Sequence, residues 1–419
     1  MTPDRPPARG DRLLFVARRP PFPLANGARI RSHRLLTGLA EVFDTTLLTF
    51  EHERSSAEGH MARDELEDML PGVRVQTVPG RRIPKRTGQL RSLGTRSSWE
   101  FGRYSSDRLR RAVADAVAEG AALVHFDDLG VALAGPAAGA VSVYSAHNVE
   151  QRIMEGTIAS AQGVRRAFAE AELRKIRREE QRAWSSISLC LAVSELDARV
   201  MRAGGARVEV CPNGADPVEA LPFASRPPGA ALRILFVGSV DYGPNYTGIA
   251  WFVDEVLPRL RETAPATLDV VGFQRRPLPM LEGVTYHGQV PSVRPFYERA
   301  HVAIAPVPFG SGTRLKIVEA MALGRPVVST HVGAEGLPVR PGIDYLAADD
   351  AEGFARALAQ IAAQTAGRDA DRLHAMLHRA RRAVSDLAWP EIVDRLAALY
   401  RSELHAAGRA AEAPRALAG

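Results

Sequence analysis

The residues most able to do chemistry lie in one stretch, Phe309–Gly336, which reads F-G-S-G-T-R-L-K-I-V-E-A-M-A-L-G-R-P-V-V-S-T-H-V-G-A-E-G. Its pattern predicts a glycine-rich loop, a helix from about Thr313 to Leu323, a tight turn at Gly324 and a buried strand at Pro326–Thr330. A second glycine loop, Gly333–Gly336, follows the strand. Backbone N–H groups of a glycine loop that opens a helix can bind an anion. The stretch therefore predicts an anion site.

Two cations of this stretch, Arg314 and Lys316, stand in the first turn of the helix, where the positive end of the helix dipole disfavours them. Lys316 also precedes Glu319 by three positions, the weaker orientation for a helical ion pair. Both placements make sense if the loop N–H groups and the two cations hold an anion together. The alternative is a solvated helix end with a weak surface pair. We favour the anion site because the glycine loop and the misplaced cations occur together.

The glycine loop, the cations and Glu319 resemble the signature of the retaining nucleotide-sugar glycosyltransferases of family 4. The resemblance implies an α/β protein of the GT-B fold, in which two Rossmann-like doubly wound domains face a central cleft. It also implies that Glu319 grips the ribose hydroxyls of the donor nucleotide and that nearby basic residues neutralise its diphosphate. The usual second glutamate, eight positions earlier, is Ser311 here, as in a branch of the family that carries G-S-G-T-R-L-K.

Shorter motifs follow the family's order along the chain: P-F-P-L-A-N-G, H-N-V-E and P-N-G-A-D. By resemblance, His147 contacts a hydroxyl of the donor sugar, with Asn148 and Glu150 beside it. Gly27 and Arg29 open the first helix, whose first turn by resemblance lies near the transferred sugar. Alternatively, Arg29 lies on a solvated basic face of the helix, and His147 has only a structural role.

The resemblance also implies how the donor is held. Departure of the nucleoside diphosphate develops negative charge on a phosphate oxygen, which preorganised N–H groups and cations stabilise. No carboxylate is placed as a covalent nucleophile, so the family's proposal of attack from the leaving-group face, with the departing phosphate taking the acceptor proton, fits best. The residues expected to bind the donor are Gly238, Ser239, Val290, Gly312, Thr313, Glu335 and Gly336.

A further polar group, formed by His125, Asp127 and Asp128, follows a predicted strand. Adjacent acids on a strand alternate in direction, so this pair favours loop capping or acceptor contact over metal coordination. No cysteine–histidine cluster has metal-ligand spacing. We expect neither a metal nor another cofactor.

Strands alternate with helices in both halves of the chain, which predicts two mostly parallel sheets. The predicted strands are 13–17, 45–50, 73–78, 123–126, 141–145, 188–193, 208–211, 232–237, 267–271, 284–287, 301–306 and 326–330. The Pro- and Ala-rich segment 212–231 predicts a linker between domains at 1–211 and 232–385. By resemblance, a helix at 386–406 crosses back onto the first domain, and residues 407–419 are predicted to be a disordered tail.

Charge and polarity suggest three local features within this framework. Residues 164–184 predict a long charged helix with a narrow apolar stripe, which favours a solvated helix over a binding element. Ser194 and Asn245 precede helical patterns and are predicted N-caps.

Composition places the chain among cytoplasmic globular proteins. It has 419 residues, of which 46% are hydrophobic and 24% are charged, enough for two or three domains. No apolar run is long enough to span a membrane, and the N-terminal residues lack the apolar core of a secretory signal. Cys190 and Cys211 lie in apolar runs and favour buried reduced thiols, with a disulfide as the alternative.

The net charge of +6 is concentrated in one basic stretch, residues 81–103. Glu100 is its one acid, and its cations are Arg81, Arg82, Lys85, Arg86, Arg91, Arg96 and Arg103. A mobile solvated loop is one interpretation. The other is peripheral contact of Arg81, Arg82, Lys85 and Arg86 with an anionic lipid carrier or the inner face of a membrane. Aromatic residues lie nearby, but the absence of a nucleic-acid motif argues against nucleic acid as a partner.

These observations favour a retaining glycosyltransferase that moves a sugar from a nucleotide-diphosphate sugar to a glycan, lipid-linked or small-molecule acceptor. Cell-surface polysaccharide or glycoconjugate synthesis is the expected setting. A nucleotide-sugar epimerase of the same fold is an alternative, which product analysis without acceptor would discriminate. Ser311 leaves open a catalytically silent module that binds nucleotide sugar without turnover.

Overall fold

The chain forms two compact units. The first contains residues 1–24, 28–211 and 390–419, and the second contains residues 25–27 and 212–389. The computed structural model describes residues 11–24, 26–51, 63–80 and 85–416, and of these the side chains of 85–86 and 410–416 are not described. Arg81 and Arg82, expected to meet an anionic partner, lie outside the described residues, as do the side chains of Lys85 and Arg86.

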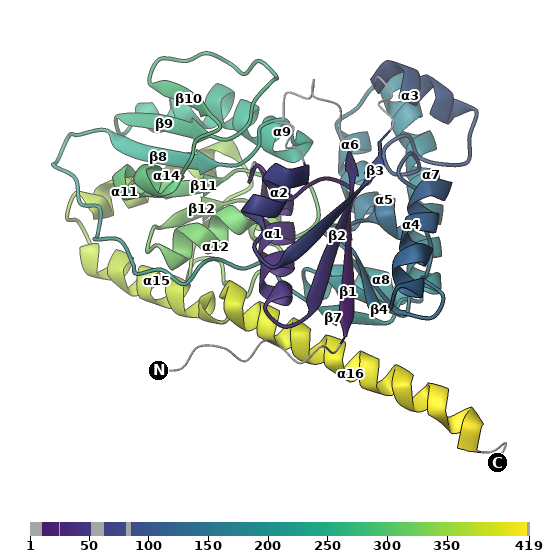
Figure 1. The fold of residues 1–419 in the computed structure, drawn as a ribbon. Coiled ribbons are helices and arrows are strands. Elements are labelled where there is room, and N and C mark those ends of the chain that lie inside the picture. Colours follow the sequence, from purple (N-terminus) through teal and green to yellow (C-terminus); the bar gives the residue numbers. More distant parts are fainter. Residues whose placement is uncertain (1–10, 25, 52–62, 81–84, 417–419) are drawn as a thin grey trace, which may run out of the picture. The chain divides into compact units, whose positions relative to one another are not determined.

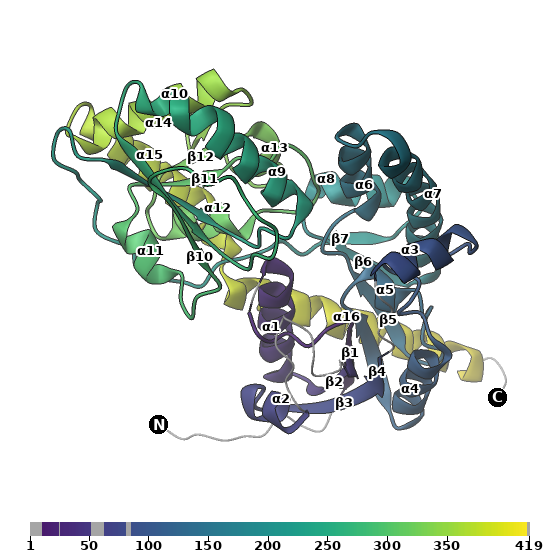
Figure 2. The same ribbon diagram turned by 90° about the horizontal axis from the view of Figure 1, so that it is seen from above.

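The first unit is built on a seven-stranded parallel sheet with the strand order β3-β2-β1-β4-β5-β6-β7 (Figures 1 and 2). The order reverses between β1 and β4, and doubly wound sheets bind ligands beyond the carboxyl ends of the strands at such a reversal. The strands are β1 (Arg12–Ala17), β2 (Asp44–Glu51), β3 (Val73–Pro79), β4 (Ala121–Phe126), β5 (Val141–Ser145), β6 (Leu189–Ala192) and β7 (Val208–Val210).

The second unit repeats this plan with a six-stranded parallel sheet in the order β10-β9-β8-β11-β12-β13, of which β8 to β12 are labelled in Figure 1. Its order reverses between β8 and β11, so the loops after these two strands mark the expected ligand edge. The strands are β8 (Leu232–Val237), β9 (Ala266–Val271), β10 (Val284–Gly288), β11 (Val302–Ala305), β12 (Val327–Ser329) and β13 (Leu346–Ala347).

Helices connect the strands and cover the sheets (Figures 1 and 2). From the N-terminus to Cys211 they are α1 (Gly27–Ala40), α2 (Arg63–Met69), α3 (Lys85–Leu93), α4 (Asp107–Ala118), α5 (Leu129–Ala132), α6 (Glu150–Ala159), α7 (Gly163–Ser186) and α8 (Glu195–Ala203). Beyond it they are α9 (Gly243–Trp251), the π-helical turn η1 (Phe252–Val256), α10 (Leu257–Arg261), α11 (Arg294–Arg299), α12 (Leu315–Ala322), α13 (His331–Ala334), α14 (Ala351–Thr365), α15 (Ala370–Ala383), the 3₁₀ turn η2 (Ser385–Leu387) and α16 (Trp389–Ala416).

The central strands are short apolar runs buried along their whole length. Every residue of β5, β6 and β11 is buried. Such continuous runs are typical of parallel sheets that helices cover on both faces. In the first unit, α1 and α16 pack closely, since a Cβ on Gly38 would come within 2.7 Å of Val393 Cγ1. This contact seats the C-terminal helix against α1.

The predicted fold class, with two Rossmann-like doubly wound units, is confirmed, and three local expectations need correction. Helix α16 continues to Ala416, where a disordered tail was expected from residue 407. Helix α6, which begins at the glutamate of H-N-V-E, was not predicted. Ser194 does cap its helix by accepting a hydrogen bond from Asp197 N, but Tyr242 occupies the N-cap expected of Asn245.

The prediction of a solvated helix at 164–184 is wrong for one face of α7. The charge pattern predicted the helix correctly but did not indicate its buried face, because the buried side chains include acids and a lysine. The buried residues of the helix are Ala169, Glu172, Leu173, Lys175, Ile176, Glu179, Glu180, Ala183 and Trp184.

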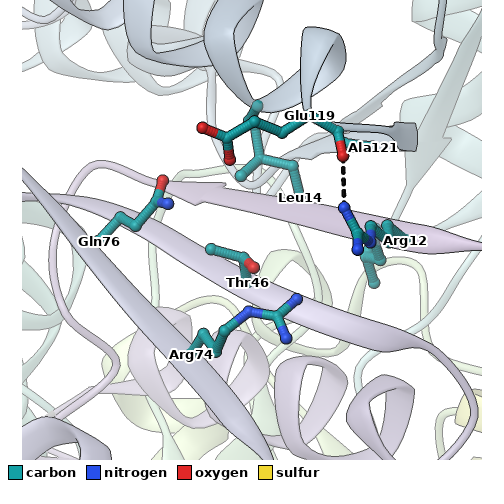
Figure 3. A pocket seen from close by; sticks show the side chains of 9 residues that line it. Arg12, Leu14, Thr46, Arg74, Gln76, Glu119 and Ala121 are labelled. Carbon is teal, nitrogen blue, oxygen red and sulfur yellow. Dashed lines mark hydrogen bonds between the residues drawn. The ribbon is translucent and has the colours of Figure 1, made fainter.

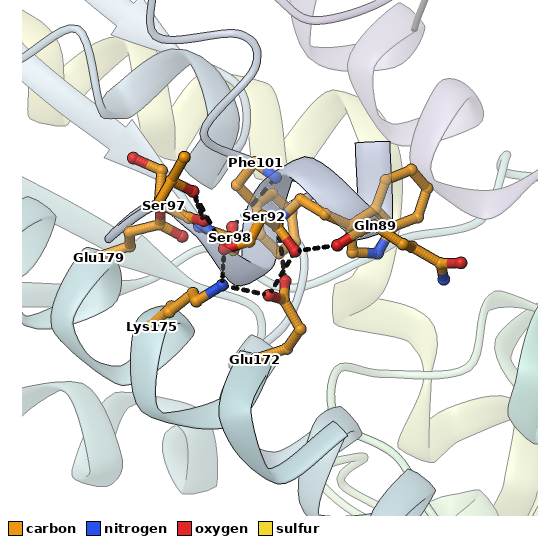
Figure 4. Close-up of polar contacts among 10 residues, drawn as sticks. Gln89, Ser92, Ser97, Ser98, Phe101, Glu172, Lys175 and Glu179 are labelled. Carbon is orange, nitrogen blue, oxygen red and sulfur yellow. Dashed lines mark hydrogen bonds and ion pairs between the residues drawn. The ribbon is translucent and has the colours of Figure 1, made fainter. Parts of the chain in front are cut away.

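The buried acids of α7 hold the chain that follows α3. Glu172 accepts hydrogen bonds from Trp99 N at 2.7 Å and from Ser92 Oγ at 3.0 Å, and Glu179 accepts one from Ser98 N at 2.8 Å (Figure 4). Backbone N–H groups away from water need such acceptors. The described part of the basic stretch is therefore held against α7 instead of forming a mobile loop.

Another acid of α7, Glu180, holds the first turn of α6. Its carboxylate accepts hydrogen bonds from Glu150 N at 2.6 Å and from Gln151 N at 3.2 Å. Burial raises the pKa of Glu180 to about 8, although these two hydrogen bonds act in the opposite direction. Burial, with the nearby carboxylates of Glu100 and Glu180, also raises the pKa of Glu150 to about 8. Both carboxyls therefore favour the protonated form in the folded protein.

Folding stability is expected to fall as the pH rises from about 5 to about 8. A carboxyl whose pKa is raised in the folded state stabilises the fold fully at pH values below its unfolded pKa of about 4.3. This stabilisation is lost as the pH rises through the folded pKa. Glu180→Gln should flatten this dependence, because Gln does not titrate and still accepts one hydrogen bond. The measurement is the urea midpoint at pH 5, 7 and 9. Glu195→Gln, at an exposed position of α8, should keep the wild-type slope, and equal slopes in all three proteins would contradict the assignment.

Candidate functional site

In the second unit, two glycines allow the loops after β8 and β9 to pass close to each other. Gly238 follows β8 and Gly272 follows β9, each with φ of 148°, which side chains rarely adopt. A Cβ on Gly272 would lie 2.1 Å from Gly238 O. A Cβ on Gly238 would lie 3.0 Å from Lys316 Nζ and 3.1 Å from Asn245 Nδ2. The bare backbone of Gly238 thus leaves room beside the lysine that the sequence singled out.

Lys316 is positioned by side chains from two neighbouring elements. Its Nζ donates a hydrogen bond to Asn245 Oδ1 at 2.9 Å and lies 3.7 Å from the centroid of the Phe236 ring. The same Asn245 donates through Nδ2 to Ser239 O at 2.8 Å, which connects the lysine to the loop after β8. Burial lowers the pKa of Lys316 well below its ordinary value, and the charge of Arg314 adds to this. No carboxylate pairs with Nζ among the described residues, so an anion bound beside it would supply the opposite charge that favours the protonated amine.

Arg314 is the N-cap of α12 and folds back over its own loop. Its Nη1 donates to Ser311 O at 2.7 Å and to Gly312 O. Its Nε and Nη2, like Thr313 Oγ1, are buried and have no hydrogen-bond partner among the described residues. Thr313 O accepts a hydrogen bond from Asn213 Nδ2 at 3.2 Å, so the P-N-G-A-D motif supports this loop. Unsatisfied buried donors are costly, which favours an anionic ligand at the helix N-terminus.

Glu319 lies in the second turn of α12 and is partly exposed. Tyr297 Oη lies 3.5 Å from Glu319 Oε2 and 3.3 Å from Lys316 O. Burial raises the pKa of Tyr297 well above its ordinary value, and the Glu319 charge adds to this. The neutral phenol is thus a donor that can orient Glu319, and no sequence motif pointed to it.

The other predicted donor residues of this unit lie in loops at the same sheet edge. Val290 follows β10. Glu335 and Gly336 follow α13, which begins directly after β12 and is capped by Thr330 Oγ1 accepting from Gly333 N. The structure thus brings Gly238, Ser239 and Lys316 into one cluster through Asn245, and it places the remaining residues along the edge.

In the first unit, Asp127 gathers side chains from three segments. His147 Nε2 lies 3.3 Å and His125 Nε2 lies 3.6 Å from Asp127 Oδ1, and Ser32 Oγ on α1 donates to Oδ2. Burial alone would raise the pKa of Asp127, but the charge of His147 and the neighbouring His125 ring hold it well below its usual range. Oδ1 itself makes no hydrogen bond among the described residues. The prediction of loop capping is confirmed for Asp128, which accepts from Val131 N and caps α5.

The other residues that the sequence predicted near the sugar are Gly27, Arg29, Asn148 and Glu150, which lie on or beside α1 and α6. Arg29 is buried, and its Nη1 donates to Pro23 O at 3.2 Å, so it does not lie on a solvated basic face. Gly27 is the first residue of α1, and Asn148 lies just before α6. Glu150 starts α6, near Arg18, whose Nε pairs with Asp128 at 2.8 Å.

A pocket in the first unit lies at the opposite, amino-terminal edge of the sheet (Figure 3). Arg12, Thr46 and Arg74 line it from the starts of β1, β2 and β3. Its cations are already engaged, since Arg12 donates to Glu119 O and Arg74 pairs with Asp44 at 2.8 Å. Ligand sites of doubly wound sheets lie at the other edge, so this pocket is not the candidate site.

The described ranges contain neither a metal-binding cluster nor a membrane-spanning helix. There, no group of three or more His, Cys, Asp or Glu side chains could hold a metal ion. No helix in the same part of the chain is long and apolar enough to cross a membrane. Both cysteines are buried and unpaired.

Comparison with known proteins bears on both units. Residues 231–364 match the family of glycosyl transferases group 1. Sucrose-phosphate synthase from Thermosynechococcus elongatus has a similar structure, with a TM-score of 0.69 and 16% identity over 95% of this chain and 100% of that chain. HepE from Anabaena, solved with UDP and glucose, has a TM-score of 0.65 and 13% identity over 94% of this chain and 100% of that chain. For α,α-trehalose 6-phosphate synthase from Burkholderia multivorans the TM-score is 0.60, with 13% identity over 95% of this chain and 99% of that chain. No curated protein sequence matches the chain.

The domain match and the fold agree. The matched segment begins at β8 and contains the glycine loops, Lys316 and Glu319. The structural likeness extends over nearly the whole of this chain and of the three relatives. Residues 231–364 therefore resemble a glycosyltransferase group 1 domain, and the whole chain has the GT-B fold.

Proposed function

We propose that the protein is a retaining, family 4 glycosyltransferase that moves a sugar from a nucleoside-diphosphate sugar to a glycan, lipid-linked or small-molecule acceptor. The observation that carries this proposal is the cationic cluster at the carboxyl edge of the second sheet. There, Lys316 contacts Asn245 beside the bare backbone of Gly238, and Arg314 closes the N-terminus of α12. A diphosphate would supply acceptors for the buried donors of this edge.

The proposed chemistry uses these groups at the leaving diphosphate. The bond between the anomeric carbon and the phosphate oxygen breaks, the acceptor oxygen attacks from the same face, and the departing phosphate oxygen takes the acceptor proton. Charge grows on that oxygen, so Lys316 and Arg314 stabilise the transition state more than the bound donor. Glu319, with Tyr297 beside it, would accept the ribose hydroxyls. His147 of the first unit would contact a sugar hydroxyl.

The test is the anomeric configuration of the product, measured by NMR with a panel of nucleotide sugars and acceptors. UDP-sugars come first, because HepE was solved with UDP and glucose. We expect the product to keep the donor's configuration and activity to persist in EDTA. An inverted product would refute retention, and activity restored only by Mg²⁺ would refute cationic side chains as the leaving-group stabilisers. An isomerised nucleotide sugar formed without acceptor would instead favour an epimerase.

The proposal includes peripheral contact with the cytoplasmic face of an anionic membrane, as in the synthesis of cell-surface polysaccharide on lipid carriers. Helix α3 exposes Leu90 (70%) and Leu93 (59%), and Arg91 and Arg96 beside them are also exposed. The helix is held on α7 through Ser92, so these side chains are presented on a fixed element (Figure 4). Exposed leucines flanked by cations suit a bilayer interface.

Neutralising Arg81, Arg82, Lys85 and Arg86 together is expected to reduce sedimentation with anionic liposomes at least tenfold at low salt. Each cation near an acidic bilayer contributes about 1 kcal/mol, and salt screens this contribution. Leu90→Ser with Leu93→Ser should weaken binding at high salt as well. Donor hydrolysis without acceptor should hardly change in either variant.

A matched control separates local from overall charge in this experiment. It neutralises exposed arginines of the second unit, namely Arg356, Arg368, Arg372 and Arg382. This variant should bind liposomes as the wild type does. Unchanged binding of the Arg81–Arg86 variant at low salt would refute membrane contact and favour a soluble acceptor.

A further inference from the structure

A buried histidine and three arginines gather at the amino-terminal edge of the second sheet, the edge opposite to that of Lys316. His301 directly precedes β11, Arg325 lies two residues before β12, and Arg233 is the second residue of β8. These strands are neighbours in the sheet, and Arg226 comes from the segment that leads to β8. His301 and Arg325 are each 2% exposed, whereas Arg233 is exposed.

The ring of His301 is held by the backbone of β8. Arg233 N donates a hydrogen bond to His301 Nδ1 at 2.9 Å, and His301 N donates one to Arg233 O at 2.9 Å. Burial, together with the charges of Arg233, Arg226 and Arg325, lowers the pKa of His301 to about 4. The ring is therefore neutral near pH 7. Because Nδ1 accepts a hydrogen bond, the one ring hydrogen lies on Nε2.

This Nε2–H is a buried donor that lacks an acceptor. Nε2 has no hydrogen-bond partner among the described residues, and the ring that carries it is buried. Folded proteins rarely leave such a donor unsatisfied, because the group loses its hydrogen bonds to water and gains none in return. The amino-terminal edge therefore needs an acceptor that the described part of the chain does not supply.

The buried arginine next to this edge is bound to carbonyl groups instead of carboxylates. Arg325 donates from Nε to Tyr297 O at 2.8 Å and from Nη1 to Pro222 O at 2.9 Å. Arg226 also donates to carbonyl oxygens, among them Ala362 O at 2.7 Å from Nη2. Carbonyl oxygens satisfy the N–H groups of these side chains but do not neutralise their charge.

The positive charge at this edge is therefore poorly balanced. Burial lowers the pKa of Arg325, and the charge of Glu298 opposes this effect. Glu298 is already paired with Arg294 at 3.0 Å. A water molecule could accept from Nε2 but would leave the charge unbalanced. An anion supplies both an acceptor for the N–H and the missing negative charge.

We propose that His301 Nε2, with the guanidinium groups of Arg233 and Arg325, binds a small inorganic anion such as chloride or phosphate. The inference does not rest on the proposed function, because the residues of the proposed donor site lie beyond the carboxyl ends of the strands. Arg325 also holds Pro222 O, so an anion that fixes this side chain fastens the segment before β8 to the sheet. A ligand that binds the folded state alone stabilises it as its concentration rises.

Ring signals of His301 test the proposal. Protein labelled with ¹⁵N in histidine is titrated at pH 7 with sodium chloride or sodium phosphate, while sodium gluconate keeps the ionic strength constant and His301→Gln assigns the signal. We expect the Nε2 signal to move to saturation with chloride, phosphate or both, and the anion that saturates at the lower concentration is the preferred one. An Nε2 signal that stays in place with both anions would mean that only water is bound there and would overturn the proposal.

A matched pair of variants separates the site from the overall charge of the protein. Arg233→Gln keeps the backbone contacts to His301 and is expected to raise the Kd of the preferred anion about tenfold, since it removes a charge-assisted hydrogen bond. Arg356→Gln removes an exposed arginine from the first half of α14 and should keep the wild-type Kd. The rise in thermal midpoint that the preferred anion gives over gluconate should shrink in Arg233→Gln and persist in Arg356→Gln. Equal Kd values in these two variants would refute the assignment of the anion to this edge.

Discussion

Glu319→Ala is expected to lower donor affinity at least 100-fold and to nearly abolish transfer. A carboxylate that accepts two ribose hydroxyls makes charge-assisted hydrogen bonds of roughly 1.5–3 kcal/mol each, and about 1.4 kcal/mol corresponds to a factor of ten. The loss should be seen in calorimetric binding of the nucleoside diphosphate alone, because the ribose belongs to that half of the donor. Glu319→Gln keeps the shape and one acceptor and should retain part of the affinity.

Two observations separate this result from damage to the fold. Tyr297 Oη lies 3.5 Å from Glu319, so removal of the carboxylate leaves a buried phenol that still has Lys316 O at 3.3 Å. Thermal unfolding without ligand should therefore change little. Glu352→Ala removes an exposed glutamate from the first turn of α14 and should bind donor normally. Wild-type kinetics of Glu319→Ala with every accepted donor would mean that this edge of the sheet is not the donor site.

Lys316→Ala and Arg314→Ala are expected to lower kcat about 100- to 1,000-fold and to raise the donor KM much less. Charge on the leaving diphosphate grows toward the transition state, and removal of one preorganised donor to such a charge costs about this much. Steady-state kinetics with the preferred donor measure both constants. If KM rose for both variants while kcat stayed constant, the two cations would hold only the bound donor.

The structure predicts a difference between these two variants. Lys316 donates only to Asn245 among the described side chains, so its loss leaves the loop backbone intact. Arg314 also donates to Ser311 O and Gly312 O, so Arg314→Ala frees two loop carbonyls and should lower the thermal midpoint as well. Arg314→Lys can restore the charge but not the two-point contact with the loop. It should recover less activity than Lys316→Arg.

Local pattern was sufficient for the positions of most strands and for the glycine loops and cations at one edge of the second sheet. Segments 141–145 and 232–237 were predicted with the same limits that β5 and β8 have in the structure. Both are short apolar runs between polar segments, and burial of such a run in a parallel sheet depends on its own residues. The glycines and cations around Lys316 could be recognised for the same reason, because loop, helix start and charges are neighbours in sequence.

Partners from distant segments could not be predicted in this way. Asn245 was assigned to a helix cap from its position, but its amide joins Ser239 to Lys316, which lies 71 residues later in the chain. Tyr297 beside Glu319 and Asn213 beside Thr313 likewise lie in separate elements. The sequence offered one usable signal, the P-N-G-A-D motif, which places an amide side chain at the start of the segment that leads to the second sheet.

The sequence by itself thus determined the two doubly wound halves, the chemistry of the signature and the likeness to glycosyltransferases. Only the tertiary structure decided which charges are buried and what they hold. In α7 the acids predicted to be solvated accept buried backbone N–H groups, and His125 contacts Tyr400, which lies 275 residues later. Periodicity reports the average polarity of a helix face, whereas the ionisation and direction of a buried group depend on the particular donor or acceptor that folding brings to it.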